Sequence, residues 1–293
     1  MFKVLVTGAK GQVGAELVKF VPAGFIVIGL GSDQLDITDK EQVSAAVYLH
    51  QPDLIINAAA YTAVDKAESD SEKAFAINEQ GVAWLAQAAK YAGIPLFHIS
   101  TDYVFDGQAT IPYKETDPVS PQSVYGASKL AGEQALSIAH SKHIILRTSW
   151  VFGAEGNNFV KTMLRLAKER DELAVVADQY GCPTSAVSIA QVLWQLAGVY
   201  QEQGALPWGI YNFSNTPACT WHEFAVGIFK QGEERGLLEN IPTVKAITTA
   251  DYPTQASRPA WSALDCRKIE SLLGVKVPEW KSELESFIKC MLN

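Results

Sequence analysis

The chain begins with an apolar segment that runs directly into a glycine loop, and this feature constrains its fold more than any other. Residues Phe2–Thr7 predict a buried strand, and Gln12–Phe20 predicts a helix. Between them lies Gly8-Ala-Lys-Gly11-Gln-Val-Gly14, with the spacing G-x-x-G-x-x-G. Glycines permit a tight turn and the close approach of a phosphate, for which the helix N-terminus supplies N–H groups. A glycine triplet alone is a weak signal, but a strand, loop and helix in this order indicate a dinucleotide-binding fold.

Short apolar runs alternate with helical stretches through the first half of the chain. The runs are rich in Val, Ile and Leu without polar alternation, as is typical of strands buried on both faces. The expected strands are Phe2–Thr7, Phe25–Gly29, Asp53–Asn57, Leu96–Ser100 and Ile144–Ser149. The expected helices between them are Gln12–Phe20, Lys40–His50, Ser71–Ala92 and Val124–His140. Right-handed connections of this kind predict an α/β fold with a doubly wound parallel sheet of the Rossmann type.

The pattern changes after Trp150. A helix is expected over Phe159–Arg170, a short strand over Glu172–Val176, a turn at Cys182–Thr184, a helix over Ile189–Tyr200 and a strand over Gly209–Ser214. The remainder is mixed and rich in Trp, Pro and Arg. We expect residues 1–150 plus about 185–215 to form the dinucleotide-binding domain. Residues about 151–184 plus 216–293 would form a smaller C-terminal substrate-binding lobe over the carboxyl ends of the strands.

Composition excludes several classes of protein. A length of 293 residues exceeds the usual size of one core, and a net charge of −8 argues against a nucleic-acid partner. No apolar run reaches the roughly 18 residues that span a membrane, and the opening segment lacks the features of a signal peptide. The four cysteines lie far apart without metal spacing, which favours free thiols in a reducing cytoplasm. We therefore expect a cytoplasmic protein that binds no membrane.

The residues around the glycine loop indicate how a dinucleotide would be held. Gly8, Gly11 and Gly14 would surround its pyrophosphate. The second strand ends Gly29-Leu-Gly-Ser-Asp33, with no carboxylate directly at its end to repel a 2′-phosphate. NADP(H) is therefore allowed, although no arginine is present there to favour it strongly. The small residues Ala58, Ala59 and Ala60 follow the third strand, where they could let a flat cofactor lie against the backbone or merely permit close helix packing.

A second set of residues suggests proton transfer to a carbonyl group. Thr101 ends the fourth strand, and Tyr125 and Lys129 follow four residues apart on one face of an expected helix. A phenol with a pKa near 10 is a poor acid or base at neutral pH, and a neighbouring ammonium would lower that pKa. Lys129 could also reach the ribose of a nicotinamide cofactor. A solvated surface pair is the alternative for Tyr125 and Lys129, but their order after the glycine loop favours catalysis.

The chain resembles the extended short-chain dehydrogenase/reductase superfamily, and within it the dTDP-4-dehydrorhamnose reductase family. The similarity covers nearly the whole chain and rests on several blocks of sequence. These are NAAAYTAVDKAE (Asn57–Glu68), STDYVF (Ser100–Phe105), YGASKLAGE (Tyr125–Glu133), RTSWVF (Arg147–Phe152), GNNFVK (Gly156–Lys161), DQYGCPT (Asp178–Thr184) and YPTQASRP (Tyr252–Pro259). The resemblance implies reduction of the 4-keto group of a dTDP-4-keto-6-deoxyhexose by NADPH, with NADH also accepted.

The resemblance also implies residue roles. Tyr125 would be the proton donor, Lys129 its tuner and ribose anchor, and Thr101 a hydrogen-bond donor to the carbonyl oxygen. Residues expected at the cofactor are Gly8, Gly11, Gln12, Val13, Gly14, Asp36, Ile37, Ala58, Ala59, Ala60, Tyr125 and Lys129. Residues expected at the substrate are Thr101, Asp102, Trp150 and Arg258, with Lys161 and Arg165 as weaker candidates. Trp150 could instead belong to the core, and Asp102 could cap a loop. Arg258 could bind the diphosphate, because a guanidinium suits phosphate geometry, or it could be a solvated surface residue.

Two alternatives for the function stay open at this point. The chain could be a non-catalytic regulatory subunit of the same fold, although the intact Thr101, Tyr125 and Lys129 favour catalysis. It could also form another dTDP-6-deoxysugar, such as 6-deoxy-L-talose. Some members of the resembling family are dimers bridged by Mg²⁺ through glutamates; Glu16 matches one of these, but Val187 stands where a second is expected. Mg²⁺ requires oxygen ligands, so we expect no metal site and either a monomer or a metal-independent dimer.

Overall fold

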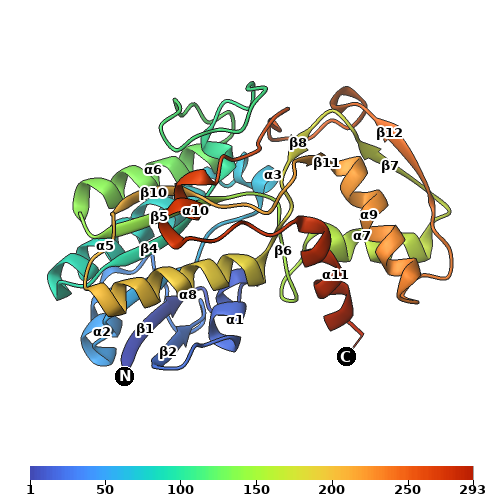
Figure 1. Ribbon diagram of the computed structural model, residues 1–293. Coiled ribbons are helices and arrows are strands. Elements are labelled where there is room, and N and C mark those ends of the chain that lie inside the picture. Colours follow the sequence, from blue (N-terminus) through green and yellow to red (C-terminus); the bar gives the residue numbers. More distant parts are fainter. Residues whose placement is uncertain (293) are drawn as a thin grey trace.

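The first strand lies inside a parallel sheet, as its continuous apolar run predicts. The computed structural model describes residues 1–292 and contains a six-stranded sheet with the order β10-β5-β4-β3-β1-β2, in which every pairing is parallel (Figure 1). Its strands are β1 (Phe2–Thr7), β2 (Phe25–Leu30), β3 (Leu54–Asn57), β4 (Leu96–Thr101), β5 (His143–Thr148) and β10 (Gly209–Asn212). The sequence order reverses beside β1, so the doubly wound Rossmann fold is confirmed.

Helices cover both faces of this sheet. One face carries α1 (Gln12–Lys19), α8 (Ala186–Gln203) and α10 (Arg267–Leu273), and the other carries α2 (Lys40–His50), α5 (Gly81–Ala92) and α6 (Val124–Ala139). Successive residues of β1 point to opposite faces: Val4 and Val6 join the α1–α8 cluster, whereas Leu5 joins the α2–α5 cluster. This is why the strands show no polar alternation.

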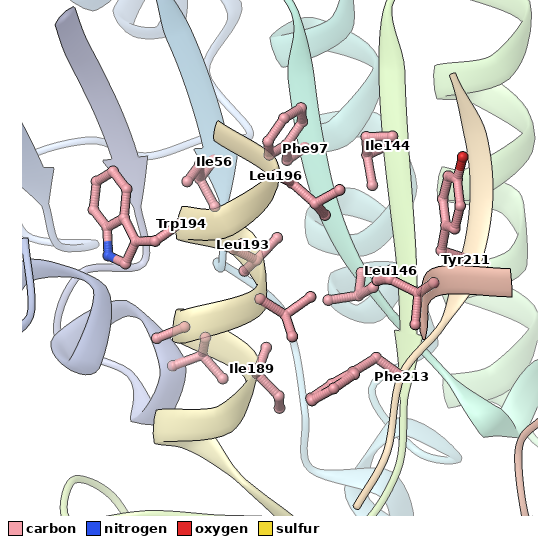
Figure 2. Packing of buried hydrophobic residues seen from close by; sticks show 14 of the residues in the cluster. Ile56, Phe97, Ile144, Leu146, Ile189, Leu193, Trp194, Leu196, Tyr211 and Phe213 are labelled. Atoms are coloured by element: carbon pink, nitrogen blue, oxygen red, sulfur yellow. The ribbon is translucent and has the colours of Figure 1, made fainter. Parts of the chain in front are cut away.

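The α8 face shows how the core positions the carboxyl ends of the strands. Figure 2 shows Ile189, Leu193 and Leu196 of α8 packed over the side chains of β3, β4, β5 and β10. The labelled strand residues of the same cluster are Ile56, Phe97, Ile144, Leu146 and Tyr211. Helix α8 starts at Ala186 because Ser185 accepts from the amides of Val187 and Ser188, one turn earlier than the sequence predicts.

One expected helix is divided into three segments. The stretch 71–92 forms α4 (Ser71–Phe75), a π-helical turn η1 (Ala76–Gln80) and α5. Asn78 of this turn exchanges hydrogen bonds with the backbone of Tyr61 and donates to the hydroxyl of Ser128. The π turn therefore links the segment before the short helix α3 (Val64–Ala67) to α6. The periodicity of the sequence does not reveal this link.

The second lobe has its own core beside the sheet (Figure 1). Three two-stranded pairs build it: β7 (Glu172–Val176) with β12 (Thr243–Ile247), β8 (Tyr180–Gly181) with β11 (Cys219–Thr220), and β6 (Val151–Phe152) with β9 (Thr184–Ser185). Its helices are α7 (Phe159–Glu169), α9 (Trp221–Glu234) and α11 (Trp280–Cys290), and its 3-10 turn is η3 (Thr249–Asp251). A further 3-10 turn, η2 (Asp102–Val104), follows β4.

One local expectation needs adjustment in this lobe. Thr184 does not end a turn but begins β9, because its amide donates to the carbonyl of Trp150. All four cysteines are free, with Cys290 exposed and the others buried. Within residues 1–292, none of the helices has both the length and the apolar character needed to cross a bilayer.

Candidate active site

The glycine loop closes tightly over the end of β3. Gly8 has a φ of +67°, and a Cβ there would lie 2.5 Å from the amide nitrogen of Ala59. A Cβ on Gly14 would lie 2.1 Å from the carbonyl oxygen of Gly8, whereas one on Gly11 would meet that oxygen at 3.3 Å. Gly8 and Gly14 are therefore required by the fold itself. The requirement at Gly11 is weaker, because a shift of a few tenths of an ångström would relieve its tight contact, and its lack of a side chain keeps the outer side of the loop open.

The N-terminus of α1 is free to receive an anion. Its N-cap residue is Gly11, which has no side chain to cap the first-turn amides. Val13 is buried in the core, so only its backbone can face a ligand. The Gln12 side chain accepts a hydrogen bond from Asn158 at 3.0 Å, which ties α1 to the second lobe. These features fit the pyrophosphate of a dinucleotide.

The end of β2 is more polar than the sequence suggests. Asp33 lies in the following loop, yet its Oδ1 would be 2.6 Å from a Cβ built on Gly31. Its Oδ2 accepts from Lys10 at 2.7 Å, and this pair is exposed. A carboxylate and an ammonium thus meet beside the strand end. Asp36 is exposed and binds the Thr38 backbone and hydroxyl.

The two other expected cofactor segments have different surroundings. Ile37 is 5% exposed and packs near Gly81 of α5, so it belongs mainly to the core. The backbone of Ala58–Ala60 is half-buried after β3, and the amide of Ala59 donates to Asn57 Oδ1 at 3.0 Å. The structure brings this segment beside Gly8.

Tyr125 and Thr101 lie together at the carboxyl edge of the sheet. Thr101 ends β4, and Tyr125 lies in the first turn of α6, which begins because Ser123 caps the amide of Gly126. Thr101 forms a side-chain hydrogen bond with Tyr125, and the ring of Tyr103 packs edge-on against Tyr125 at 5.5 Å. Burial raises the pKa of Tyr125 above its usual value, although the bond with Thr101 opposes this. The phenol therefore holds its proton at neutral pH.

The expected lowering of the pKa of Tyr125 is not found in this structure, because burial raises that pKa instead. Its Nζ donates to the carbonyl oxygen of Ile99 at 2.7 Å and lies 3.3 Å from His98 Nε2. The side chain is only 2% exposed. Burial lowers the pKa of Lys129 to about 8, against the raising effect of Glu133. Desolvation is thus the largest influence on the pKa of Lys129 and on that of Tyr125.

A buried ion pair supports this region from behind. Glu133 lies one turn after Lys129 and accepts from Arg147 of β5 at 2.6 Å and from Ser100 of β4 at 2.5 Å. Both charged side chains are 2% exposed. The pair joins α6, β4 and β5 at the carboxyl edge of the sheet. Losing one partner would leave a buried charge, which is far more costly than losing an exposed pair.

Asp102 follows Thr101 and is 3% exposed. One carboxylate oxygen accepts from the Thr101 hydroxyl at 2.9 Å. Burial raises the pKa of Asp102 to about 6, and its hydrogen bonds only partly oppose this. The carboxylate is therefore held in an unfavourable environment beside Tyr125, where an additional hydrogen-bond donor would stabilise it.

Arg258 reaches across from the second lobe to this site. It donates to the Tyr103 hydroxyl at 3.0 Å and to Asp65 Oδ2 at 2.6 Å. Its side chain is 24% exposed, and that of Asp65 is 43% exposed. Arg258 is therefore not the plain surface residue of the alternative interpretation, because it joins α3 to the wall that contains Tyr125. Asp65 and Tyr103 are functional candidates that sequence reasoning missed.

Trp150 is enclosed between two neighbours. Its ring stacks on Trp221 with 3.5 Å between centroids and an angle of 7°. On its other side, a Cβ on Gly181 would lie 2.3 Å from the indole. Trp150 has a positive φ of 47° and stays half-buried. The edge of the Trp150 ring, rather than its faces, is left for a ligand. Trp221, like Tyr103, is an aromatic residue of the site that the sequence analysis did not identify.

The remaining candidates have partners outside the Thr101–Tyr125 pair. Lys161 donates to the carbonyls of Ala154 and Gly156 and holds their loop, whereas Arg165 forms an exposed ion pair with Glu169. Glu16 is 3% exposed, and burial raises its pKa. Val187 lies in the first turn of α8. Beside it, Ser188 donates to Glu283 of α11, a carboxylate that the sequence reading did not place there.

The combination of this fold with Thr101 and a Tyr-x-x-x-Lys pair occurs in one large class of enzymes. The strand order, the glycine loop and the lobe over the sheet edge place the chain among the extended short-chain dehydrogenase/reductases. The family model described as "RmlD substrate binding domain" matches residues 2–293. The chain belongs to the dTDP-4-dehydrorhamnose reductase family.

Individual relatives agree with this assignment. A dTDP-4-dehydrorhamnose reductase from Aggregatibacter actinomycetemcomitans is 48% identical over 98% of each chain. The crystal structure of the Clostridium acetobutylicum enzyme of that name superposes with a TM-score of 0.91 at 40% identity, covering 100% of both chains. The Bacillus anthracis enzyme, solved in complex with NADP, also has a TM-score of 0.91, at 38% identity over 99% of each chain.

Proposed function

We propose that this protein reduces the 4-keto group of dTDP-4-dehydro-β-L-rhamnose with NADPH and thereby forms dTDP-β-L-rhamnose. The observation that carries the proposal is the placement of a protonated Tyr125 against Thr101, with Lys129 buried behind them. The names of the relatives and the NADP bound to the Bacillus anthracis enzyme support the substrate and the cofactor.

The glycine loop fits the cofactor. Gly8 and Gly14 fold the loop, Gly11 leaves its outer side open, and the amides of Gln12 and Val13 at the start of α1 would hold the pyrophosphate. Asp36 and the backbone of the buried Ile37 would lie toward the adenosine end, and Ala58–Ala60 would line the cofactor. NADPH supplies the hydride for the carbonyl carbon.

Tyr125 and Thr101 act on the carbonyl oxygen. Thr101 donates a hydrogen bond to this oxygen, and Tyr125 transfers its phenolic proton to it as the carbon–oxygen double bond is reduced. The ammonium form of Lys129 stabilises the phenolate that remains and holds the nicotinamide ribose. The high pKa of Tyr125 suits an acid that must stay protonated until the oxygen becomes basic.

The substrate lies between the sheet edge and the second lobe. Asp102 accepts a hydrogen bond from a sugar hydroxyl, which would supply the donor its buried carboxylate needs. Arg258 meets the diphosphate, because a guanidinium binds phosphate in a fixed geometry. The edge of Trp150 contacts the sugar. Residues 1–150 and about 185–215 would hold the cofactor, and the rest would form the substrate-binding lobe.

We place this reaction in the cytoplasm and assign it to a monomer or a metal-independent dimer. Glu16 is buried within its own chain, so it is poorly placed to bind a shared cation. Val187 offers no oxygen ligand.

The test is a turnover experiment. The protein is mixed with NADPH and dTDP-4-dehydro-β-L-rhamnose, and the ultraviolet absorbance of NADPH is followed. We expect the absorbance to fall and proton NMR of the product to show the rhamnose configuration at C4. A talose product would change the stereochemical assignment. Binding without consumption of NADPH would support a regulatory subunit and contradict the proposal.

A further inference from the structure

A buried histidine that the mechanism above does not use lies directly behind Lys129. His98 of β4 is fully buried. Its two ring nitrogens contact different groups: Nδ1 lies 3.0 Å from Asn57 Nδ2, and Nε2 lies 3.3 Å from Lys129 Nζ. Burial holds the pKa of His98 well below its usual range, so the ring is neutral and carries one proton. Which nitrogen carries it determines what Lys129 meets.

The orientation of Asn57 decides this question. Its Oδ1 accepts from the backbone amide of Ala59 at 3.0 Å and from the Thr7 hydroxyl at 2.6 Å. A backbone N–H can only donate, so the oxygen of the Asn57 side chain must face it and the NH₂ group must face His98. Because an NH₂ group only donates, His98 Nδ1 must accept. The proton of the neutral ring is therefore on Nε2.

This proton points toward Lys129. An N–H of His98 can form a hydrogen bond with Lys129 Nζ only if that nitrogen offers a lone pair, which the neutral amine has and the ammonium lacks. The other polar contact of Nζ, with the carbonyl oxygen of Ile99, can be made in both protonation states. The contact with His98 thus favours the neutral amine of Lys129, in the same direction as burial.

We infer that His98, held by Asn57 with its proton on Nε2, is a positioning residue that sets the pH at which Lys129 loses its charge. The inference rests on the proposed role of Lys129 in the reduction. A series of side-chain contacts, Thr7–Asn57–His98–Lys129, begins at the residue before the glycine loop. His98 would link this series to the proton donor Tyr125 through Lys129.

Other charged or titratable groups also act around Lys129, and they are unchanged in the experiment below. Glu133 on its own helix raises its pKa and is itself neutralised by the ion pair to β5. The groups presented by the surrounding elements are His98 from β4, Tyr125 and Glu133 from α6, Arg147 from β5, and Asp102 and Tyr103 from η2.

The decisive variant is Asn57→Asp. Both carboxylate oxygens accept, so the new side chain keeps the contacts with Thr7 and Ala59 but requires a proton on His98 Nδ1. In the neutral ring, Nε2 then becomes an acceptor, which favours the ammonium of Lys129. Thr7→Val is the matched control, because it removes a hydroxyl from the same chain and leaves the contact between Asn57 and His98 in place.

The first measurement is ¹⁵N NMR of the histidine rings, with His98 assigned by the signal that His98→Gln removes. We expect a proton on Nε2 in the wild type and Thr7→Val, and a proton on Nδ1 in Asn57→Asp. A wild-type proton on Nδ1 would overturn the inference. This readout needs no turnover, so it is separate from a failure of the proposed reductase activity.

The second measurement is the pH profile of kcat/KM. Activity should fall as pH rises through the pKa of Lys129, because the ammonium is the working form. In Asn57→Asp this fall should move to higher pH by about one unit, equivalent to about 1.4 kcal/mol of differential interaction. In Thr7→Val it should stay in place. The charge of the new carboxylate could by itself shift the pH profile. Asn57→Asp is therefore repeated in the His98→Gln background. If it shifts the profile there by as much as it does in the presence of His98, the role of His98 is contradicted.

Discussion

The two walls of the site hold their polar groups in different ways. The catalytic wall, formed by Thr101, Tyr125 and Lys129 on β4 and α6, is supported by side chains that are almost completely buried, including an ion pair with both partners 2% exposed. The lobe wall, formed by Trp150, Trp221 and Arg258, is more open, and its ion pair to Asp65 is 24% and 43% exposed. The first wall is arranged before a ligand arrives.

This difference indicates a division of work. Buried, fully satisfied polar networks hold groups in fixed geometry, as proton transfer requires. Partly exposed ion pairs contribute little to stability and can exchange partners when a ligand binds. We therefore expect changes in the catalytic wall to act mainly on kcat and changes in the lobe wall to act mainly on the KM for the sugar nucleotide.

The largest effect is expected for Tyr125→Phe. It removes the proton donor, so kcat should fall by about 10²–10⁴-fold, the usual contribution of general acid catalysis. NADPH affinity, measured by fluorescence titration, should be nearly unchanged because the glycine loop supplies most of it. Lys129→Ala should reduce both. A Tyr125→Phe variant with wild-type kcat would show that the catalytic wall is wrongly assigned.

Arg258→Ala should act on the other wall. It removes the guanidinium proposed to bind the diphosphate, and hydrogen bonds to charged groups are worth about 1.5–3 kcal/mol, or about 10–100-fold in KM. Steady-state kinetics with varied sugar nucleotide measures this. Arg165→Ala is the control, because its ion pair to Glu169 is exposed and should leave KM unchanged.

A stability measurement can sharpen the contrast. Asp102 has a folded-state pKa of about 6, above its ordinary value of 3.8, so its contribution to stability is lost as pH rises through the folded pKa. Asp102→Asn should therefore raise Tm more at pH about 8 than at pH about 4, by several degrees on the scale of about 2–4 °C per kcal/mol for a chain of this size. An equal change in Tm at both pH values would mean that the carboxylate is not destabilised by burial.

Cofactor preference should depend on a smaller difference. Lys10 favours a 2′-phosphate, and Asp33 beside it opposes one, so we expect a modest preference for NADPH over NADH in kcat/KM. Asp33→Asn should increase this preference and Lys10→Ala should reduce it. A preference for NADH beyond about a hundredfold, or about 2.7 kcal/mol, would mean that a carboxylate discriminates after all.

No effect is expected from metal removal. Activity and oligomeric state should be the same with Mg²⁺ and with EDTA, because Val187 provides no ligand and Glu16 is buried. Light scattering alongside the turnover assay is the measurement. A dimer that forms with Mg²⁺ and dissociates with EDTA would refute this part alone.

The first half of the fold was predictable, because strands buried on both faces and the helices between them leave strong patterns. Strand β1 and helix α2 match their predicted bounds, and β2 ends one residue later. The second lobe lacked such patterns, since β6, β8, β9 and β11 have two residues each. Helix α9 was missed although Thr220 and Glu223 form a capping box, a signal visible in the sequence.

The site divides in a similar way. Thr101, Tyr125 and Lys129 follow from spacing on one strand end and one helix face. The partners of these residues depend on folding over long distances: Arg258 meets Asp65 at a separation of 193 residues. The surroundings of Lys129 could not be predicted either, because no sequence pattern shows that its side chain turns toward Ile99 and His98.

The most direct test of the division between the walls is a double-mutant cycle of kcat/KM with Tyr125→Phe, Arg258→Ala and the double variant. If one wall performs proton transfer and the other binds the diphosphate, the two losses in free energy should add within about 0.5 kcal/mol. A coupling energy above about 1 kcal/mol would show that Arg258, through Tyr103, acts on the proton donor, and would contradict the separation of chemistry from binding.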